Sequence, residues 1–191
     1  MSFLKSLLKL FHKQKRIEKT KFYHIHKLGN HDEQWQEGKK LDISSDNPFW
    51  TLAVNYIPSG PPGNQIIEYQ MLIRELGLEY IREKKFPNYP SRKHCIWLVG
   101  HKQNQLDYWI EQLKENEVTL FEVETLGGKL FKGRNALLPI PSNSFKEIIE
   151  KSLSYWQCNQ KIEYEDEEYL YEGKIKIIKK IPKPRLIQQH I

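Results

Sequence analysis

The sequence predicts a single α+β domain with a mixed or antiparallel sheet and three or four flanking helices. Three observations predict this class. Segments with helical and strand-like spacing are interleaved without the regular β-α-β alternation of a doubly wound parallel sheet. The chain of 191 residues, 39% of them hydrophobic, is long enough for one well-filled core and short for two. No apolar run approaches the roughly 20 residues that a membrane-spanning helix requires.

The first half of the domain alternates strand and helix. Residues 21–28 alternate in the manner of a strand, and this places Phe22, His24 and His26 on one face. The loop 58–64 is rich in proline and glycine, and a long helix is predicted over 65–84. The apolar residues that predict this helix recur at helical spacing: Ile66, Tyr69, Ile73, Leu76 and Tyr80.

The second half repeats the mixture. A buried strand over 94–100 precedes a helix over 103–115. Residues 118–133 resemble a hairpin that turns at Gly127 and Gly128. Ser144 and Glu147 form a capping box that starts a third helix. The stretch 164–181 supplies one or two final strands.

Charge is distributed unevenly along the chain. Residues 1–21 carry seven lysines and arginines against one glutamate, and residues 174–191 carry six and no acid. Because the whole chain has a net charge of +6, residues 22–173 form an acidic middle of −6. Such a middle argues against a nucleic-acid groove through the main domain, although the two basic ends would form one patch if they met.

Residues 1–21 form a basic amphipathic segment ahead of a domain over 22–191 that ends in a basic tail. The apolar residues of the segment share one helical face: Phe3, Leu7, Leu10 and Phe11. Lys5 and Lys9 interrupt the apolar run, so the segment does not resemble a signal peptide. Three interpretations stay open: a helix on an anionic membrane surface or a partner, a helix docked on the domain, and a frayed terminus.

Several classes of chemistry lack their motifs. The sequence contains no Walker loop, no GxGxxG after a strand, no GxSxG and no HExxH, so nothing points to kinase, Rossmann or hydrolase chemistry. Two cysteines make neither a disulfide framework nor a four-ligand zinc site, and a reducing, cytoplasmic setting fits them best. His24 and His26 share a strand face, but without a third ligand at recognisable spacing we expect no metal site.

Two further positions are candidates for chemistry. Arg92 precedes the apolar strand over 94–100, where its guanidinium could grip a phosphate or pair with an acid. Residues 165–168 are four consecutive acids, of which we expect at most two to face inward. Glu168 shares a strand face with Leu170, so we select it as the functional carboxylate and expect its three neighbours to be solvated. A carboxylate at the lip of a sheet can stabilise positive charge that develops on a sugar carbon.

The order of three short motifs resembles the ADP-ribosyltransferase-like fold, in particular small bacterial members of it. These motifs are FYHIHK in the first strand, PSRKHCIWLV in the middle and EEYLYEGKIKII in the last strand. The resemblance implies a split sheet that clasps NAD as a substrate, with Glu168 as the catalytic carboxylate. It implies that His24 contacts the adenosine ribose, Arg92 the pyrophosphate and Tyr23 a ring; whether His24 or His26 faces the cleft stays open.

The resemblance implies transfer of ADP-ribose from NAD to a protein or nucleic-acid acceptor. The alternative is a non-catalytic interaction domain on the same scaffold, tethered by residues 1–21 to a membrane surface or a partner. The enzyme and the interaction domain predict different positions for the selected residues. The enzyme requires His24, Arg92 and Glu168 to converge on one cleft, whereas the interaction domain allows His24 and Glu168 to lie apart. A nucleic-acid binder that uses both basic ends is a third, less favoured, hypothesis.

Overall fold

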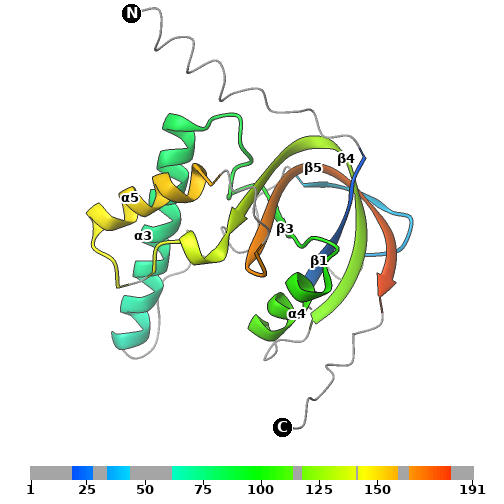
Figure 1. Ribbon diagram of the computed structural model, residues 1–191, viewed down its shortest axis with the longest axis horizontal. Coiled ribbons are helices and arrows are strands. Elements are labelled where there is room, and N and C mark those ends of the chain that lie inside the picture. The colour runs from blue at the N-terminus through cyan, green and yellow to red at the C-terminus, as the bar shows by residue number, and fades with distance from the viewer. Residues whose placement is uncertain are drawn as a thin grey trace, which may run out of the picture.

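The computed structural model describes residues 19–27, 34–43, 62–113, 118–140, 142–158 and 164–181. The predicted α+β class is confirmed, with three α-helices and five antiparallel strands in these ranges (Figure 1). The elements are β1 (Lys21–Lys27), β2 (Lys40–Ile43), α3 (Pro62–Lys85), β3 (Ile96–Leu98), α4 (Gln103–Gln112), β4 (Val118–Arg134), the 3-10 helix η2 (Asn135–Leu137), α5 (Phe145–Trp156) and β5 (Glu167–Ile181). The predicted N-terminal amphipathic helix lies outside the described residues, apart from residues 19–21. No helix in the described ranges is long and apolar enough to cross a membrane.

The sheet curls into a small barrel. β1 pairs with β4, β4 with β5, and β5 with both β2 and β3 along its other edge. β3 then returns to β1, because the backbones of Tyr23 and Val99 exchange two hydrogen bonds of 2.8 and 2.9 Å. Every strand therefore contributes to one enclosed apolar core, whose buried members are Phe22, Leu98, Phe121, Val123, Tyr171, Ile175 and Ile177.

The predicted hairpin at Gly127 and Gly128 is wrong, since β4 is one continuous strand. The pairing with β5 shifts register between Thr125 and Gly128, so the glycines form a bulge that bends the strand instead of reversing it. Gly128 and its partner Gly173 have φ of 148° and 150°. A Cβ on Gly128 would lie 2.3 Å from the carbonyl oxygen of Glu172, so only glycine lets the two strands approach here.

Beyond this bend, β4 and β5 leave the barrel and carry a layer of two helices, α3 and α5 (Figure 1). The two helices cross closely at Gly77, where an added Cβ would lie 2.6 Å from Cγ2 of Ile148. The predicted capping box is confirmed at the start of α5, because Ser144 and Glu147 satisfy each other's backbone N–H groups. The core beneath the helices consists of Leu78, Ile81, Cys95, Phe131, Tyr155, Trp156 and Leu170.

The remaining helix, α4, packs on the outer face of the barrel. Leu106 and Ile110 of α4 form a small cluster with Leu120 of β4, and Tyr23 and Ile25 of β1 border it. The barrel is thus covered at one end by α3 and α5 and on one side by α4. The predicted helices over 65–84 and 103–115 are both confirmed, as α3 and α4.

Candidate functional site

The acidic run at the start of β5 is mostly buried. Asp166, Glu167 and Glu168 are 8%, 1% and 3% exposed, whereas Glu165 is exposed. The expectation that all three neighbours of Glu168 are solvated is therefore wrong for Asp166 and Glu167. Side chains alternate between the faces of a strand, so consecutive acids reach different partners without crowding one another. Each of the three buried acids is paired with a cation.

Glu168 belongs to a buried network between the sheet and the helix layer. Its Oε1 accepts a hydrogen bond from the hydroxyl of Tyr155 and lies 3.6 Å from Nη1 of Arg92. Arg92 also donates to the Tyr155 hydroxyl at 3.2 Å. On its other side, Nε of Arg92 donates to Oε2 of Glu75 at 2.7 Å. One arginine thus joins a carboxylate of α3 to a carboxylate of β5, with a tyrosine of α5 between them.

Burial and charge act in opposite directions on the pKa values of this network. Burial alone would lower the pKa of Arg92, but Glu75, Tyr155 and Glu168 raise it well above its usual value. Burial opposes ionisation of Glu75, yet Arg92 and then Arg74 hold the pKa of its carboxyl below the usual range. For Glu168 burial prevails over Arg92, and the pKa of this carboxyl is raised. Arg92 therefore favours the ionised form of Glu75 more effectively than that of Glu168.

The loop before β3 is held by carboxylates from both layers. Glu79 of α3 accepts from the backbone N–H of Arg92 at 3.0 Å and from the hydroxyl of Ser91 at 2.9 Å. Glu172 of β5 accepts from the backbone N–H of Ser91 at 2.8 Å and pairs with Lys129 at 2.9 Å. These contacts fix the position of Arg92 before its side chain enters the network. The Arg92 guanidinium also lies over the ring of Trp97, 5.4 Å from its centroid.

The other two buried acids join the strand start to neighbouring elements. Asp166 accepts from Arg134 at 3.0 Å and from the backbone N–H of Ala136 at 2.8 Å, and so secures η2. Glu167 accepts from Gln105 of α4 at 2.6 Å and pairs with Lys132 at 2.7 Å. Both carboxylates are satisfied by the protein's own donors. Their geometry is that of structural anchors.

His24 lies inside the barrel, away from the network. Its ring stacks on Trp35, with centroids 4.3 Å apart, and its Nδ1 is 2.9 Å from the carbonyl oxygen of Trp97. Burial lowers the pKa of His24 to about 4, so the ring is neutral at pH 7. The His26 ring is 5.7 Å from that of His24, and the described residues contain no group of three or more ligands that could hold a metal ion.

The sheet separates His24 from Glu168. His24 shares its strand face with Phe22, which packs in the barrel core beside Tyr171. Glu168 shares its face with Leu170, which packs under the helices. Leu170 and Tyr171 are consecutive residues of β5, so these two faces are opposite sides of one sheet.

The structure thus brings together two of the four residues selected from the sequence. Arg92 and Glu168 are in one network, whereas His24 points into the barrel. Tyr23 is the neighbour of His24 in β1 and faces the other way, with its ring 4.7 Å from that of His101. The convergence of His24 with Arg92 and Glu168 that the enzyme requires is therefore not observed.

Sequence reasoning missed two members of the network, Glu75 and Tyr155. A signal for Glu75 was present, because Glu75, Glu79 and Arg82 recur on one face of α3, opposite its apolar face. Charged helix faces are usually solvated, so this pattern alone does not indicate a buried network. Nothing local marks Tyr155, which lies in α5 next to Trp156 and has the pattern of an ordinary core aromatic.

Fold and network together define the class of protein. It is an α+β domain in which a buried Glu–Arg–Tyr–Glu network joins a two-helix layer to a small antiparallel barrel. Residues 53–183 match the family described as a protein of unknown function (DUF2441), and the chain belongs to this family. The matched range contains the whole network and all of α3, α4 and α5. None of the curated proteins compared with the chain matches it.

Proposed function

We propose that this protein is a non-catalytic interaction domain that presents the outer face of α3 to a protein partner. One observation carries the proposal: α3 keeps an apolar stripe exposed, while three of its charged side chains are buried beside Leu78 and Ile81. Glu75, Glu79 and Arg82 are inside, 1%, 2% and 8% exposed. The exposed large apolar side chains of the helix are Ile66, Ile67, Tyr69, Ile73, Leu76 and Tyr80.

An exposed apolar stripe together with buried charges is unusual for a helix that serves only its own domain. A helix at the surface of a globular protein ordinarily turns its apolar stripe to the core and its charges to water. Here the inner charges are compensated by Arg92 and Ser91, while the apolar stripe has no counterpart among the described residues within the domain. A contiguous apolar face of this kind marks an interaction site.

The surroundings of Glu168 support a structural role for this carboxylate. A group that stabilises an oxocarbenium-like transition state has to touch the reacting sugar. Glu168 instead accepts from Tyr155, faces Arg92 and is 3% exposed. Its raised pKa also opposes the fixed negative charge that such a transition state needs. We therefore assign Glu168 to the junction between β5 and the helices.

The ADP-ribosyltransferase is the second candidate, and one observation favours it. The carboxylate and the arginine that the resemblance places on the ribose and the pyrophosphate do lie together, 3.6 Å apart. An enzyme of this class would have to open the network before NAD could reach Glu168. The tether through residues 1–21 to a membrane or a partner stays a proposal that accompanies the interaction domain.

Nicotinamide release and NAD binding by the purified chain test the choice between the two. We expect neither from the parent protein, and we expect Glu168→Gln to alter thermal stability alone. Glu165→Gln is the matched control, because it removes a charge from the same run at an exposed position. Release by the parent that falls on the order of 10²-fold in Glu168→Gln, but not in Glu165→Gln, would establish the transferase and end the present proposal.

A further inference from the structure

The exposed stripe of α3 has the spacing of a helix-pairing seam. Its central members are Ile66, Tyr69, Ile73, Leu76 and Tyr80. The intervals between them are three, four, three and four residues, which is the a/d pattern that two packed helices share. At a rise of 1.5 Å per residue the stripe is roughly 21 Å long. Each member is between 41% and 57% exposed, so the whole seam is accessible at once.

We propose that the stripe pairs with the same stripe of a second copy of this chain, antiparallel about a two-fold axis at Ile73. This pairing rests on the proposed function, in which α3 presents its outer face to a protein partner. It identifies the partner as a second copy of the same chain.

The order of side chains along the stripe is self-complementary. Ile66 and Tyr80 are both seven residues from Ile73, so an antiparallel pair sets each Tyr80 against the partner's Ile66. Tyr69 and Leu76 lie four residues before and three after the axis, so each Tyr69 meets the partner's Leu76. Every tyrosine then faces an aliphatic side chain, and Ile73 faces Ile73. A two-fold interface requires this kind of match, in which residue i contacts j and j contacts i.

Electrostatics favour the antiparallel arrangement over the parallel one. The last turn of α3 carries Arg82, Lys84 and Lys85. A parallel pair would set the two exposed lysines of each helix beside those of its partner and would align the helix dipoles. An antiparallel pair places the two basic turns at opposite ends of the interface and opposes the dipoles.

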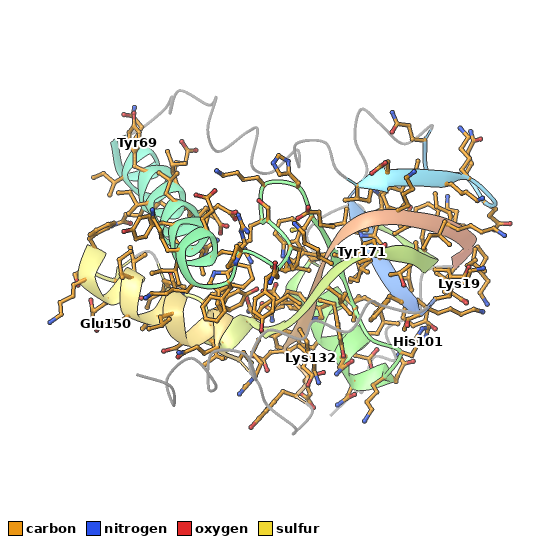
Figure 2. All side chains as sticks on the ribbon, turned by 90° about the horizontal axis from the view of Figure 1, so that it is seen from above. Lys19, Tyr69, His101, Lys132, Glu150 and Tyr171 are labelled. Atoms are coloured by element: carbon orange, nitrogen blue, oxygen red, sulfur yellow. The ribbon has the colours of Figure 1, made fainter. Side chains whose placement is uncertain are left out.

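The area available is sufficient for a specific dimer. Half of an aromatic or large aliphatic side chain amounts to about 100 Å². Five such side chains on each of two copies would remove on the order of 1,000 Å² from water, the area that a specific interface has to reach. Figure 2 shows Tyr69 at the periphery of the molecule on α3, in contrast to Tyr171, which lies in its interior.

Sedimentation velocity on the full chain, at concentrations from about 1 to 100 μM, tests the pairing. We expect a dimer for the parent protein. Ile73→Glu sets two like charges at the axis, so we expect its dissociation constant to rise roughly 30-fold or more. Ile73 is 41% exposed, so this variant should keep the circular dichroism spectrum and melting temperature of the parent. Phe145→Glu is the matched control: it charges an apolar residue of α5 that is 67% exposed, and should leave the dimer unchanged.

A second measurement locates the axis directly. Ile73→Cys should form an intermolecular disulfide under mild oxidation, because the two positions meet at the axis. Ile67→Cys, beside the seam, should not. Both variants are compared with the parent protein, whose own Cys95 and Cys158 report any background linkage.

Three outcomes would overturn the pairing. They are a monomer at every concentration, a dimer that Ile73→Glu leaves intact, and a monomer that sediments with anionic vesicles unless Ile73→Glu is present. The last would assign the stripe to a lipid surface. A monomer without NAD turnover would overturn the pairing but not the proposed function. NAD turnover that Glu168→Gln abolishes would overturn the proposed function, whether the protein is a monomer or a dimer.

Discussion

The guanidinium of Arg92 lies 3.6 Å from the carboxylate of Glu168, and both side chains are buried at the junction of the barrel and the helix layer. Because Arg92 also holds Glu75 of α3, this one side chain connects the sheet to both helices through charge-assisted hydrogen bonds. Removing one partner of a buried charge network lowers the free energy of unfolding by more than the whole network contributes to it. The reason is that the remaining buried charges are left uncompensated.

Arg92→Met should therefore destabilise the fold by about 3–5 kcal/mol, the usual loss when buried carboxylates are left unpaired. Urea denaturation at pH 7 measures this change. Arg74→Met is the matched control: Arg74 also binds Glu75, at 2.9 Å, but Glu75 retains Arg92 when it is removed. Its loss should be within about 1 kcal/mol. Equal losses in the two variants would show that the network does not depend on Arg92.

His24 should make stability depend on pH between 6.5 and 4. Burial lowers the pKa of His24 from 6.5 to about 4. In this interval the unfolded chain binds a proton that the folded protein does not bind, so stability falls as the pH falls. The loss of stability caused by His24 reaches about 3 kcal/mol near pH 4. Above pH 6.5 there is no such loss, because the imidazole is neutral in both the folded and the unfolded chain.

His24→Asn keeps a donor near the Trp97 carbonyl and removes this titration. Urea midpoints measured from pH 7 to pH 4 should fall less steeply in His24→Asn than in the parent. His101→Gln, an exposed histidine on the outside of the barrel, should keep the slope of the parent. Identical slopes in the parent and in His24→Asn would mean that the folded barrel admits the imidazolium.

At the bend of β4, the cost of an unfavourable backbone conformation can be measured separately from the cost of a steric clash. Gly127 and Gly128 both have positive φ, 96° and 148°, but only at Gly128 would a Cβ meet backbone atoms. Gly127→Ala should cost about 1 kcal/mol from conformation alone. Gly128→Ala adds the clash with Glu172 and should cost at least twice as much. Thermal melting of the pair decides this, and a larger loss for Gly127→Ala would contradict the geometry of the bulge.

The local elements could be predicted from the sequence because their signals are local. Apolar spacing identifies α3 and α4, and the capping box from Ser144 to Glu147 marks the start of α5. These interactions span three or four residues, so they are the same in any fold. The hairpin prediction failed because a pair of glycines such as Gly127 and Gly128 is compatible with either a turn or a bulge. Which one forms depends on Gly173, far along the chain in β5.

The acidic run shows where local reasoning ends. Glu168 was selected as the functional carboxylate and its neighbours were expected to be solvated, but Glu167 and Asp166 are buried together with Glu168. The cost of burying a charge depends on the donors that meet it, and these donors come from α4, β4, η2 and the loop before β3. The exposure of a run of four acids therefore cannot be predicted from the run alone. Its exposure is a property of the assembled fold.

The sequence by itself determined the α+β class, the helices and the existence of an apolar stripe along α3, because the spacing of apolar residues depends only on their order in the chain. Only the tertiary structure decided which side of α3 faces inward, and it placed Glu75 and Glu79 inside and Ile73 and Tyr80 outside. The physical reason is that Ser91 and Arg92, in the loop that follows α3, fold back and satisfy the buried carboxylates of the helix. Once those charges are compensated, the core accepts them and the apolar stripe is left for a partner.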